Sequence, residues 1–319
     1  MAGGARDFAE GEPCWTDAML SDVEAGKRFY GELLGWTFGG PVAERDAYTV
    51  ALLQGREAAA LFAKPDGRMP TAWNLYFATY DAGATLARVR QAGGQVLMGP
   101  TLVPGMGTNA FATDPSGAVF GLWQPEERSG FGVVREPGAY VWSELLTREE
   151  DAGAVDSFYT AVFGYGTHKA DFGADSEAAG EDFAVWTPAA PGGDAGADGG
   201  VDGGADGGGA DGGGADGGGA DGGGADGGVR DGAQGGGAED AAAVCGRGFL
   251  GATHPPEMPP HFLTYFSVTD CDAAVDTAVR LGGRVRGGPT DTAYGRHALL
   301  VDDQGADFAV MRPGSAGQG

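Results

Sequence analysis

WNLYFATYDAGATLARVRQAGGQVLMGP, residues Trp73 to Pro100, aligns without a gap with FLTYFSVTDCDAAVDTAVRLGGRVRGGP, residues Phe262 to Pro289. Each stretch opens with a run of apolar and aromatic residues typical of a strand. It continues into an acidic residue and an amphipathic helical pattern that ends at glycine; in the second copy Asp270 is the expected cap. Each stretch therefore predicts a strand followed by a helix.

A second pair of segments repeats in the same way. WTD at 15–17, leading to FYGELLGW at 29–36, returns as WSE at 142–144, leading to FYTAVFGY at 158–165, with two extra residues in the second copy. Short β-type runs follow each helix pattern, and one of them contains DPSG, the residue order that a type I turn prefers. The repeats predict an α+β fold of four βαβββ modules that form two domains.

The spacing between the copies locates an insertion. The first pair of repeats is displaced by 127 to 129 residues and the second by 189, so about 60 residues are added between Tyr165 and His261. The motif GGGAD repeats there in tandem, and a tract with so few side chains to bury is predicted to be disordered. The predicted organisation is a tail at 1–10, a first domain at 11–127, a linker at 128–136, a second domain at 137–313 interrupted by the insert at about 190–244, and a tail at 314–319.

The charge of the chain limits its partners. The net charge is −25, and the tract from Pro191 to Val244, with ten Asp, one Glu and one Arg, carries −10 of it. Such an acidic surface repels phosphate backbones and anionic lipid heads. We therefore expect a small-molecule ligand, and neither nucleic acid nor a membrane, as the partner. The sequence is also compatible with a homodimer.

The cysteine content and the hydropathy of the sequence indicate where the protein is located. Cys14, Cys245 and Cys271 are too few and too scattered for a disulfide framework or a zinc cluster. No run of apolar residues approaches the roughly 20 that span a membrane. These features predict a cytoplasmic protein.

Three motifs together resemble the vicinal oxygen chelate superfamily, which contains glyoxalase I, extradiol dioxygenases and bleomycin-resistance proteins. They are FYxxLxGW after the first helix, WxxYF at the start of the second module and DPxGAxFxLW at the end of the first domain. Within this superfamily the chain is similar to tandem glyoxalase-like proteins of actinobacteria, often labelled hydroxylases, some of which accompany polyketide antibiotic pathways. The resemblance implies paired modules whose curved sheets enclose a cavity.

The resemblance also implies where a metal would be held. Metal-dependent members take ligands from the first strand of each module, seven residues before the helix-capping acid, and from each final strand. With Asp22, Asp81, Glu149 and Asp270 taken as the helix caps, the positions that can be assigned hold Trp15, Asn74, Gly121, Trp142, Leu263 and Ala309. None is His, Glu or Asp, whereas a transition metal needs three or four N, O or S donors. We therefore expect no metal and no other cofactor.

Two aromatic and two acidic residues are the first site candidates. Trp15 and Trp142 stand at the implied ligand positions, where they could bind a flat ligand or fill the core. Asp17 and Glu144 share the same strand faces in the two domains, and burying a carboxylate without a partner is costly. Each is either paired with a neighbour or acts as a general base or as the acceptor for a substrate hydroxyl.

The remaining candidates line the same faces. Tyr76 and Tyr265 follow the implied ligand positions by two residues and could donate a hydrogen bond to a ligand carbonyl, with core packing as the alternative. Asn74 and Trp123 complete the predicted binding residues. The four histidines show no metal-binding spacing; His254 and His261 are expected in a loop and His297 on a strand.

The sequence therefore predicts a metal-independent, glyoxalase-like protein that binds a small aromatic metabolite, either as an accessory to biosynthesis or for protection by sequestration. The alternative is an enzyme of the lyase, isomerase or hydroxylase type that uses Asp17 or Glu144 as its base. Because Leu263 replaces the Asn74 of the first domain and the insert interrupts the second, the second domain is expected to be the degenerate half.

Overall fold

The structure is a computed structural model that describes residues 8–39, 48–170, 183–188, 243–251 and 254–314. The GGGAD tract, for which disorder is predicted, lies outside these described residues. The first module contains β1 (Pro13–Leu20), α1 (Val23–Leu34), β2 (Thr37–Phe38), β3 (Tyr48–Leu53) and β4 (Arg56–Ala63). The second contains β5 (Ala72–Ala78), α2 (Ala82–Gln91), β6 (Gln95–Val103), β7 (Gly107–Thr113) and β8 (Val119–Pro125).

The second half of the chain follows the same plan. The third module contains β9 (Tyr140–Thr147), the 3₁₀ turn η1 (Glu149–Asp151), α3 (Ala152–Phe163), β10 (Gly166–Lys169), β11 (Ala184–Thr187) and β12 (Cys245–Phe249). The fourth contains β13 (His261–Ser267), α4 (Cys271–Arg280), β14 (Arg284–Thr292), β15 (Gly295–Val301) and β16 (Asp307–Pro313). None of the helices in the described residues is long and apolar enough to cross a membrane.

The strands form two eight-stranded sheets with the same order. One sheet runs β2-β3-β4-β1-β5-β8-β7-β6 and the other β10-β11-β12-β9-β13-β16-β15-β14. In each sheet two modules meet through an antiparallel pair of their first strands, β1 with β5 and β9 with β13. The predicted α+β fold of four βαβββ modules is therefore confirmed.

Local capping explains where three of the four helices begin. The side chains of Asp22, Asp81 and Asp270 each accept a hydrogen bond from the backbone N–H three residues later, at 3.0, 2.9 and 3.1 Å. Such a bond satisfies one of the free N–H groups in the first helical turn. These acids are the caps that the sequence predicts.

The third helix differs from the prediction. Glu149, the expected cap, instead starts the η1 turn, and α3 begins at Ala152 without a side-chain cap. A count of seven residues back from Asp151 would move the implied ligand position to Glu144.

The strand register shows that the position stays at Trp142. Trp142 pairs with Tyr265 in the second sheet as Trp15 pairs with Tyr76 in the first. The two extra residues of the second copy therefore lie in the connection between strand and helix, which the η1 turn accommodates.

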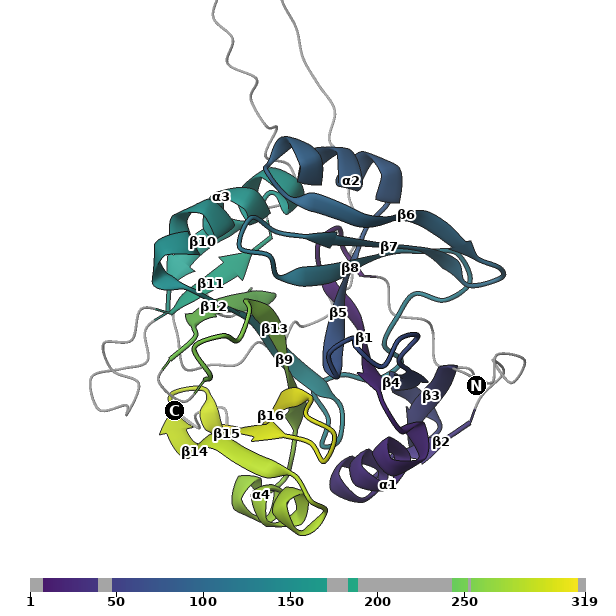
Figure 1. The fold of residues 1–319 in the computed structure, drawn as a ribbon, viewed down its shortest axis with the longest axis vertical. Coiled ribbons are helices and arrows are strands. Elements are labelled where there is room, and N and C mark those ends of the chain that lie inside the picture. Colours follow the sequence, from purple (N-terminus) through teal and green to yellow (C-terminus); the bar gives the residue numbers. More distant parts are fainter. Residues whose placement is uncertain (1–7, 40–47, 171–182, 189–242, 252–253, 315–319) are drawn as a thin grey trace, which may run out of the picture. The chain divides into compact units, whose positions relative to one another are not determined.

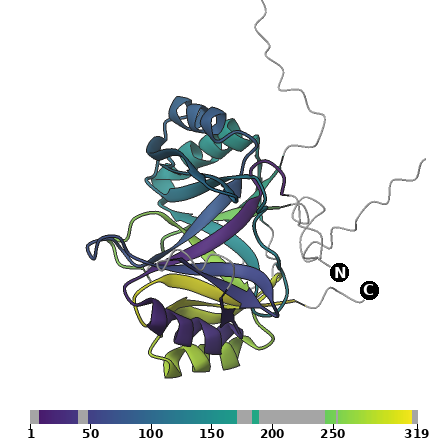
Figure 2. The same ribbon diagram turned by 90° about the vertical axis from the view of Figure 1, so that its right-hand side faces the viewer.

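The two sheets pack together through two hydrophobic clusters, each of which contains aromatic residues of both sheets. Phe77 packs against Phe262 with ring centroids 5.5 Å apart, and Trp73 packs against Phe266 at 5.0 Å. The helices pack in pairs, α1 with α4 and α2 with α3. These pairs lie at opposite ends of the described part of the chain (Figures 1 and 2). Each helix pair thus joins a module of the first domain to one of the second.

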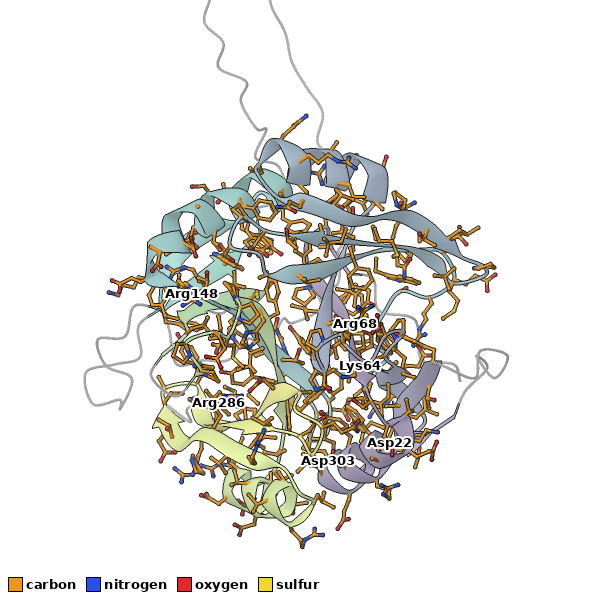
Figure 3. The ribbon with its side chains drawn as sticks, viewed as in Figure 1. Asp22, Lys64, Arg68, Arg148, Arg286 and Asp303 are labelled. Carbon is orange, nitrogen blue, oxygen red and sulfur yellow. The ribbon has the colours of Figure 1, made fainter. Side chains whose placement is uncertain are left out.

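Buried hydrogen bonds also cross between the domains. The hydroxyl of Tyr30 on α1 donates to Asp302 Oδ2 at 2.9 Å and accepts from Trp73 Nε1 at 3.0 Å. Asp22 and Asp303, labelled in Figure 3, are near enough to interact electrostatically, and the Gln304 side chain binds both backbone groups of Asp22. In the equivalent place, Tyr159 donates to Asp114 at 3.3 Å.

We expect Tyr30→Phe to lower the free energy of unfolding by about 1–3 kcal/mol, because it leaves the buried Asp302 and Trp73 groups without a partner. Tyr80→Phe is the matched control, since Tyr80 is 71% exposed; its effect should stay within about 0.5 kcal/mol. Urea unfolding of the two variants measures this difference. Equal stability of both variants would contradict the assigned role of the Tyr30 hydroxyl.

Candidate ligand-binding site

Strand β1 carries the candidate site on one of its two faces, and two residues of that site, Trp15 and Tyr76, are each only 6% exposed and belong to a hydrophobic cluster. The alternate residues Thr16 and Ala18 of β1 are fully buried towards the core, so Trp15 and Asp17 point to the opposite face. We call the face that carries Trp15, Asp17, Asn74 and Tyr76 the Trp15 face. Its equivalent in the second sheet, with Trp142, Glu144, Leu263 and Tyr265, is the Trp142 face. The predicted site residues of each domain therefore come together on one sheet face.

Asp17 is the centre of the Trp15 face. Tyr76 and Tyr48 donate their hydroxyl hydrogens to Asp17 Oδ2 at 2.8 and 3.0 Å. The amide of Asn74 donates to Oδ1 at 2.9 Å. Asp17 is only 1% exposed, and three donors offset part of the cost of burying its charge. Of the two alternatives for Asp17, the structure contains the first, a carboxylate that is paired with its neighbours.

Two residues of this cluster are not predicted from the sequence. Tyr48 lies on β3 and accepts a hydrogen bond from Trp15 Nε1 at 2.9 Å. Arg128, from the predicted linker, places its guanidinium 4.3 Å from the centre of the Trp15 ring and forms a 2.7 Å ion pair with Glu57. Neither residue belongs to a repeated motif, so no local sequence signal marks it.

The buried cluster changes the acidity of its members. Burial raises the pKa of Asp17 to about 6, while the hydrogen bonds from Asn74, Tyr76 and Tyr48 and the charge of Arg128 act in the opposite direction. Burial, followed by the nearby charge of Asp17, raises the pKa of both Tyr48 and Tyr76 well above the usual value. Both phenols therefore stay protonated and remain donors to the carboxylate at neutral pH.

The positions implied for a metal are filled by this cluster. A Cβ atom on Gly121 would lie 2.3 Å from Cδ1 of Tyr76, so the tyrosine ring occupies the space into which a ligand side chain would project. The amide of Asn74 is engaged with Asp17. Within the part of the chain that the structure describes, no three His, Cys, Asp or Glu side chains gather closely enough to hold a metal. The residues of the Trp15 face do not fit the family's metal.

The Trp142 face repeats the acid and tyrosine pair. Tyr265 donates to Glu144 Oε1 at 2.9 Å, and Glu144 is 8% exposed. Ala309 stands opposite Tyr265 as Gly121 stands opposite Tyr76. His297 on β15 lies with its ring centre 6.1 Å from that of Tyr265. The Trp142 face therefore has the same acid and tyrosine pair as the Trp15 face, with His297 beside the tyrosine.

The remaining candidates lie around these clusters. Trp123 Nε1 donates to the backbone carbonyl of Arg128 at 2.8 Å, and its indole covers Gly107, where a Cβ would come within 2.7 Å of the ring. His254 lies in a loop as expected, but His261, expected in the same loop, is the first residue of β13.

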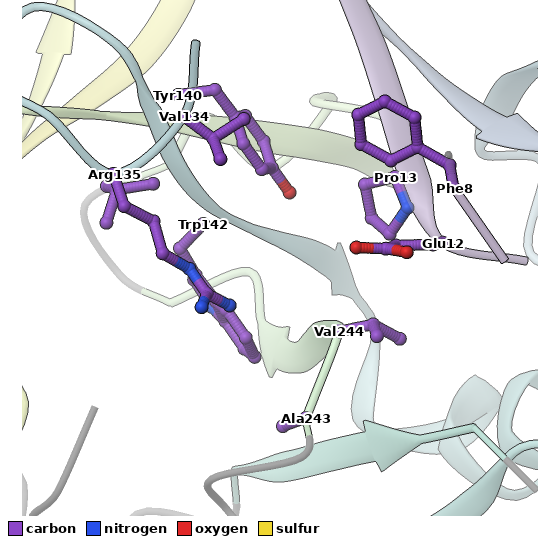
Figure 4. A pocket seen from close by; sticks show the side chains of 10 residues that line it. Phe8, Glu12, Pro13, Val134, Arg135, Tyr140, Trp142, Ala243 and Val244 are labelled. Atoms are coloured by element: carbon purple, nitrogen blue, oxygen red, sulfur yellow. The ribbon is translucent and has the colours of Figure 1, made fainter. Parts of the chain in front are cut away.

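A small cavity opens beside Trp142 (Figure 4). Its volume is about 40 Å³, and its lining includes Glu12, Arg135, Tyr140 and Val244. Pockets for drug-sized ligands measure about 300–1,000 Å³, whereas a few water molecules need only tens of Å³. This cavity can take water or a small polar group, and it is too small for an aromatic ring.

Asp17→Asn should remove a pH dependence of stability. Because the folded pKa is raised from its ordinary 3.8 to about 6, the contribution of Asp17 is fully present below about pH 4 and is lost as the pH rises through 6. The wild type should therefore lose on the order of 3 kcal/mol relative to the variant over this interval. Urea unfolding at several pH values measures the difference; parallel curves for the two proteins would contradict it.

Gly121→Ala should disturb the Trp15 face, because the added methyl group collides with the Tyr76 ring. We expect a loss of about 1–3 kcal/mol in the free energy of unfolding. Gly99→Ala is the matched control, since a Cβ there meets no atom within 4 Å. If thermal unfolding shows both variants to be equally stable, the close packing of Tyr76 over Gly121 is wrong.

Comparisons with known proteins agree with this architecture. Residues 15–122 match the profile of the Glyoxalase/Bleomycin resistance protein/Dioxygenase superfamily. The chain is 31% identical over 315 residues to the putative glyoxylase CFP32 of Mycobacterium bovis, covering 96% of this chain and 97% of that protein. It is 32% identical over 323 residues to the anthracycline biosynthesis protein DnrV of Streptomyces peucetius, covering 95% of this chain and 94% of that protein.

Solved structures share the fold at low sequence identity. The Mn(II)-bound glyoxalase from Novosphingobium aromaticivorans superposes with a TM-score of 0.54 at 14% identity, over 94% of this chain and 82% of that one. The 2,3-dioxygenase LapB from a Pseudomonas species gives 0.56 at 12% identity, over 97% and 94%. The full-length relatives, together with the motifs and the module order, show that the chain belongs to the glyoxalase/bleomycin resistance protein/dioxygenase superfamily.

Proposed function

We propose that this chain is a glyoxalase-like protein of secondary metabolism that binds a small aromatic metabolite at its Trp15 and Trp142 faces. Binding requires no metal at the ligand positions of the family. A relative named for anthracycline biosynthesis, similar over almost its whole length, supports the metabolic setting. The ligand class rests on the side chains of the two faces.

The observation that carries this proposal is the repetition of one constellation. The Trp15, Asp17 and Tyr76 set of the first domain recurs as Trp142, Glu144 and Tyr265 in the second. Apolar residues would fill a core at lower cost than a buried acid and its donor. Aromatic walls with a few fixed polar groups are what binding sites for small aromatic molecules offer.

The rims of the faces are accessible from solvent. On the Trp15 face, Tyr48, Asn74, Phe111 and Trp123 are only partly buried, while Asp17 beneath them is sealed. A flat ligand can therefore lie against the aromatic rim while the acid and tyrosine pair holds that rim in place.

The alternative is an enzyme with Asp17 or Glu144 as general base. The pKa of about 6 for Asp17 favours it, because a base works best with a pKa near the operating pH. Against it, both oxygens of Asp17 already accept hydrogen bonds from Asn74, Tyr48 and Tyr76. A base in this position would have to exchange one of these donors for the substrate.

Titration with a panel of aromatic polyketides, followed by tryptophan fluorescence in the presence of EDTA, tests the proposal. We expect saturable quenching that is unchanged by the chelator. Tyr76→Phe, which loosens the cluster at the floor of the face, should weaken binding about tenfold, and Tyr80→Phe at an exposed site should not.

Two results would count against the binding proposal. One is the absence of saturable quenching across the panel, and the other is binding that EDTA abolishes. Conversion of a bound compound that stops in Asp17→Asn or Glu144→Gln would favour the enzyme instead.

A further inference from the structure

One equivalent position in the two domains holds a buried polar atom without a partner. Asn109 on β7 stands opposite Thr101, and His297 on β15 stands opposite Thr290, so the two residues occupy the same place in their sheets. Asn109 Oδ1 and His297 Nδ1 are both buried, and neither forms a hydrogen bond with any of the described residues.

Both atoms belong to the candidate binding faces. Asn109 is two residues from Phe111, whose ring packs 5.3 Å from that of Tyr76, so alternation along the strand places the Asn109 side chain on the Trp15 face. The ring of His297 lies 6.1 Å from that of Tyr265 on the Trp142 face. His297 is therefore a neighbour of the tyrosine that donates to Glu144, and Asn109 shares the Trp15 face with the tyrosine that donates to Asp17.

Both atoms can accept a hydrogen bond. The side-chain oxygen of Asn109 is an acceptor, and burial lowers the pKa of His297, which keeps its ring neutral at neutral pH. A neutral imidazole with its proton on Nε2 accepts at Nδ1. A buried acceptor left unpaired is costly, and native proteins rarely keep one without a reason. Two such atoms at equivalent positions point to a shared use.

The Trp15 face differs in one further respect. Arg128 Nη2 is also buried and without a partner in the described part of the chain. Because its guanidinium lies over Trp15, this face offers a free donor as well as the Asn109 acceptor. It can therefore engage both a hydroxyl and a carbonyl oxygen of one ligand.

We propose that each domain binds one hydroxyl-bearing aromatic molecule, whose hydroxyl donates to Asn109 Oδ1 on the Trp15 face and to His297 Nδ1 on the Trp142 face. This inference rests on the proposed function and adds to it the ligand's donor group and a stoichiometry of one ligand per domain. It also makes the second domain a functional half, contrary to the degenerate role that the sequence predicts.

Matched probes test the inference on the wild-type protein. Isothermal titration compares 2-hydroxyanthraquinone with 2-methoxyanthraquinone. In the second compound a methyl group replaces the hydroxyl hydrogen, so it has no hydrogen to donate. We expect the hydroxyl compound to bind at both domains and about tenfold more tightly than the ether, because only the hydroxyl satisfies the buried acceptors.

Variants assign the two sites. Asn109→Leu and His297→Phe should each remove one hydroxyl-selective site and leave the other. Thr108→Val, on the opposite face of β7, should retain both. Circular dichroism and the unfolding midpoint establish that the variants are folded, and the wild-type comparison of the two probes stands without them.

The outcomes separate the inference from the proposed function. Equal affinity for the hydroxyl compound and its ether, or a preference for the ether, overturns the inference and leaves aromatic binding intact. One site per chain, unaffected by either Asn109→Leu or His297→Phe, overturns the pairing of domains. No binding of either probe counts against both proposals.

Discussion

A buried carboxylate needs donors, and this requirement organises the Trp15 face. Asp17 is 1% exposed and keeps its charge because Tyr48, Tyr76 and Asn74 all point to it. To reach Asp17, the ring of Tyr76 lies directly over Gly121, where any side chain would collide with it. The arrangement that stabilises the acid therefore also fills the space that a metal ligand would need.

The packing between the two sheets holds both faces in fixed positions. Phe77 and Trp73 of the first sheet pack against Phe262 and Phe266 of the second, and each helix pair spans both domains. The opposite sheet faces are thereby left for other uses. The repeated acid and tyrosine pair supports the proposed binding at each face, and solved structures named as a glyoxalase and a 2,3-dioxygenase share the fold.

Much of the fold follows from local signals in the sequence. The gapless repeat at 73–100 and 262–289 specifies a strand and a helix, and Asp22, Asp81 and Asp270 cap their helices as expected. Caps and strand alternation depend on neighbours within a few residues, which is why they can be predicted. The same alternation places Trp15, Asp17, Asn74 and Tyr76 correctly on one face.

The rest depends on long-range packing. Tyr48 reaches Asp17 only because β3 pairs with β4, which in turn pairs with β1. Arg128 reaches Trp15 from a segment that the sequence marks only as a linker. The η1 turn that displaces the start of the third helix is likewise not predicted, because three acids in a row at 149–151 leave the position of the cap open.

The metal content of the purified protein is the most direct measurement of the central claim. The account predicts that protein expressed with added iron, zinc, manganese and nickel contains none of them in stoichiometric amount, because Trp15, Asn74 and Gly121 offer no free donor set. One tightly held transition metal per domain, retained after dialysis against a chelator, would contradict it.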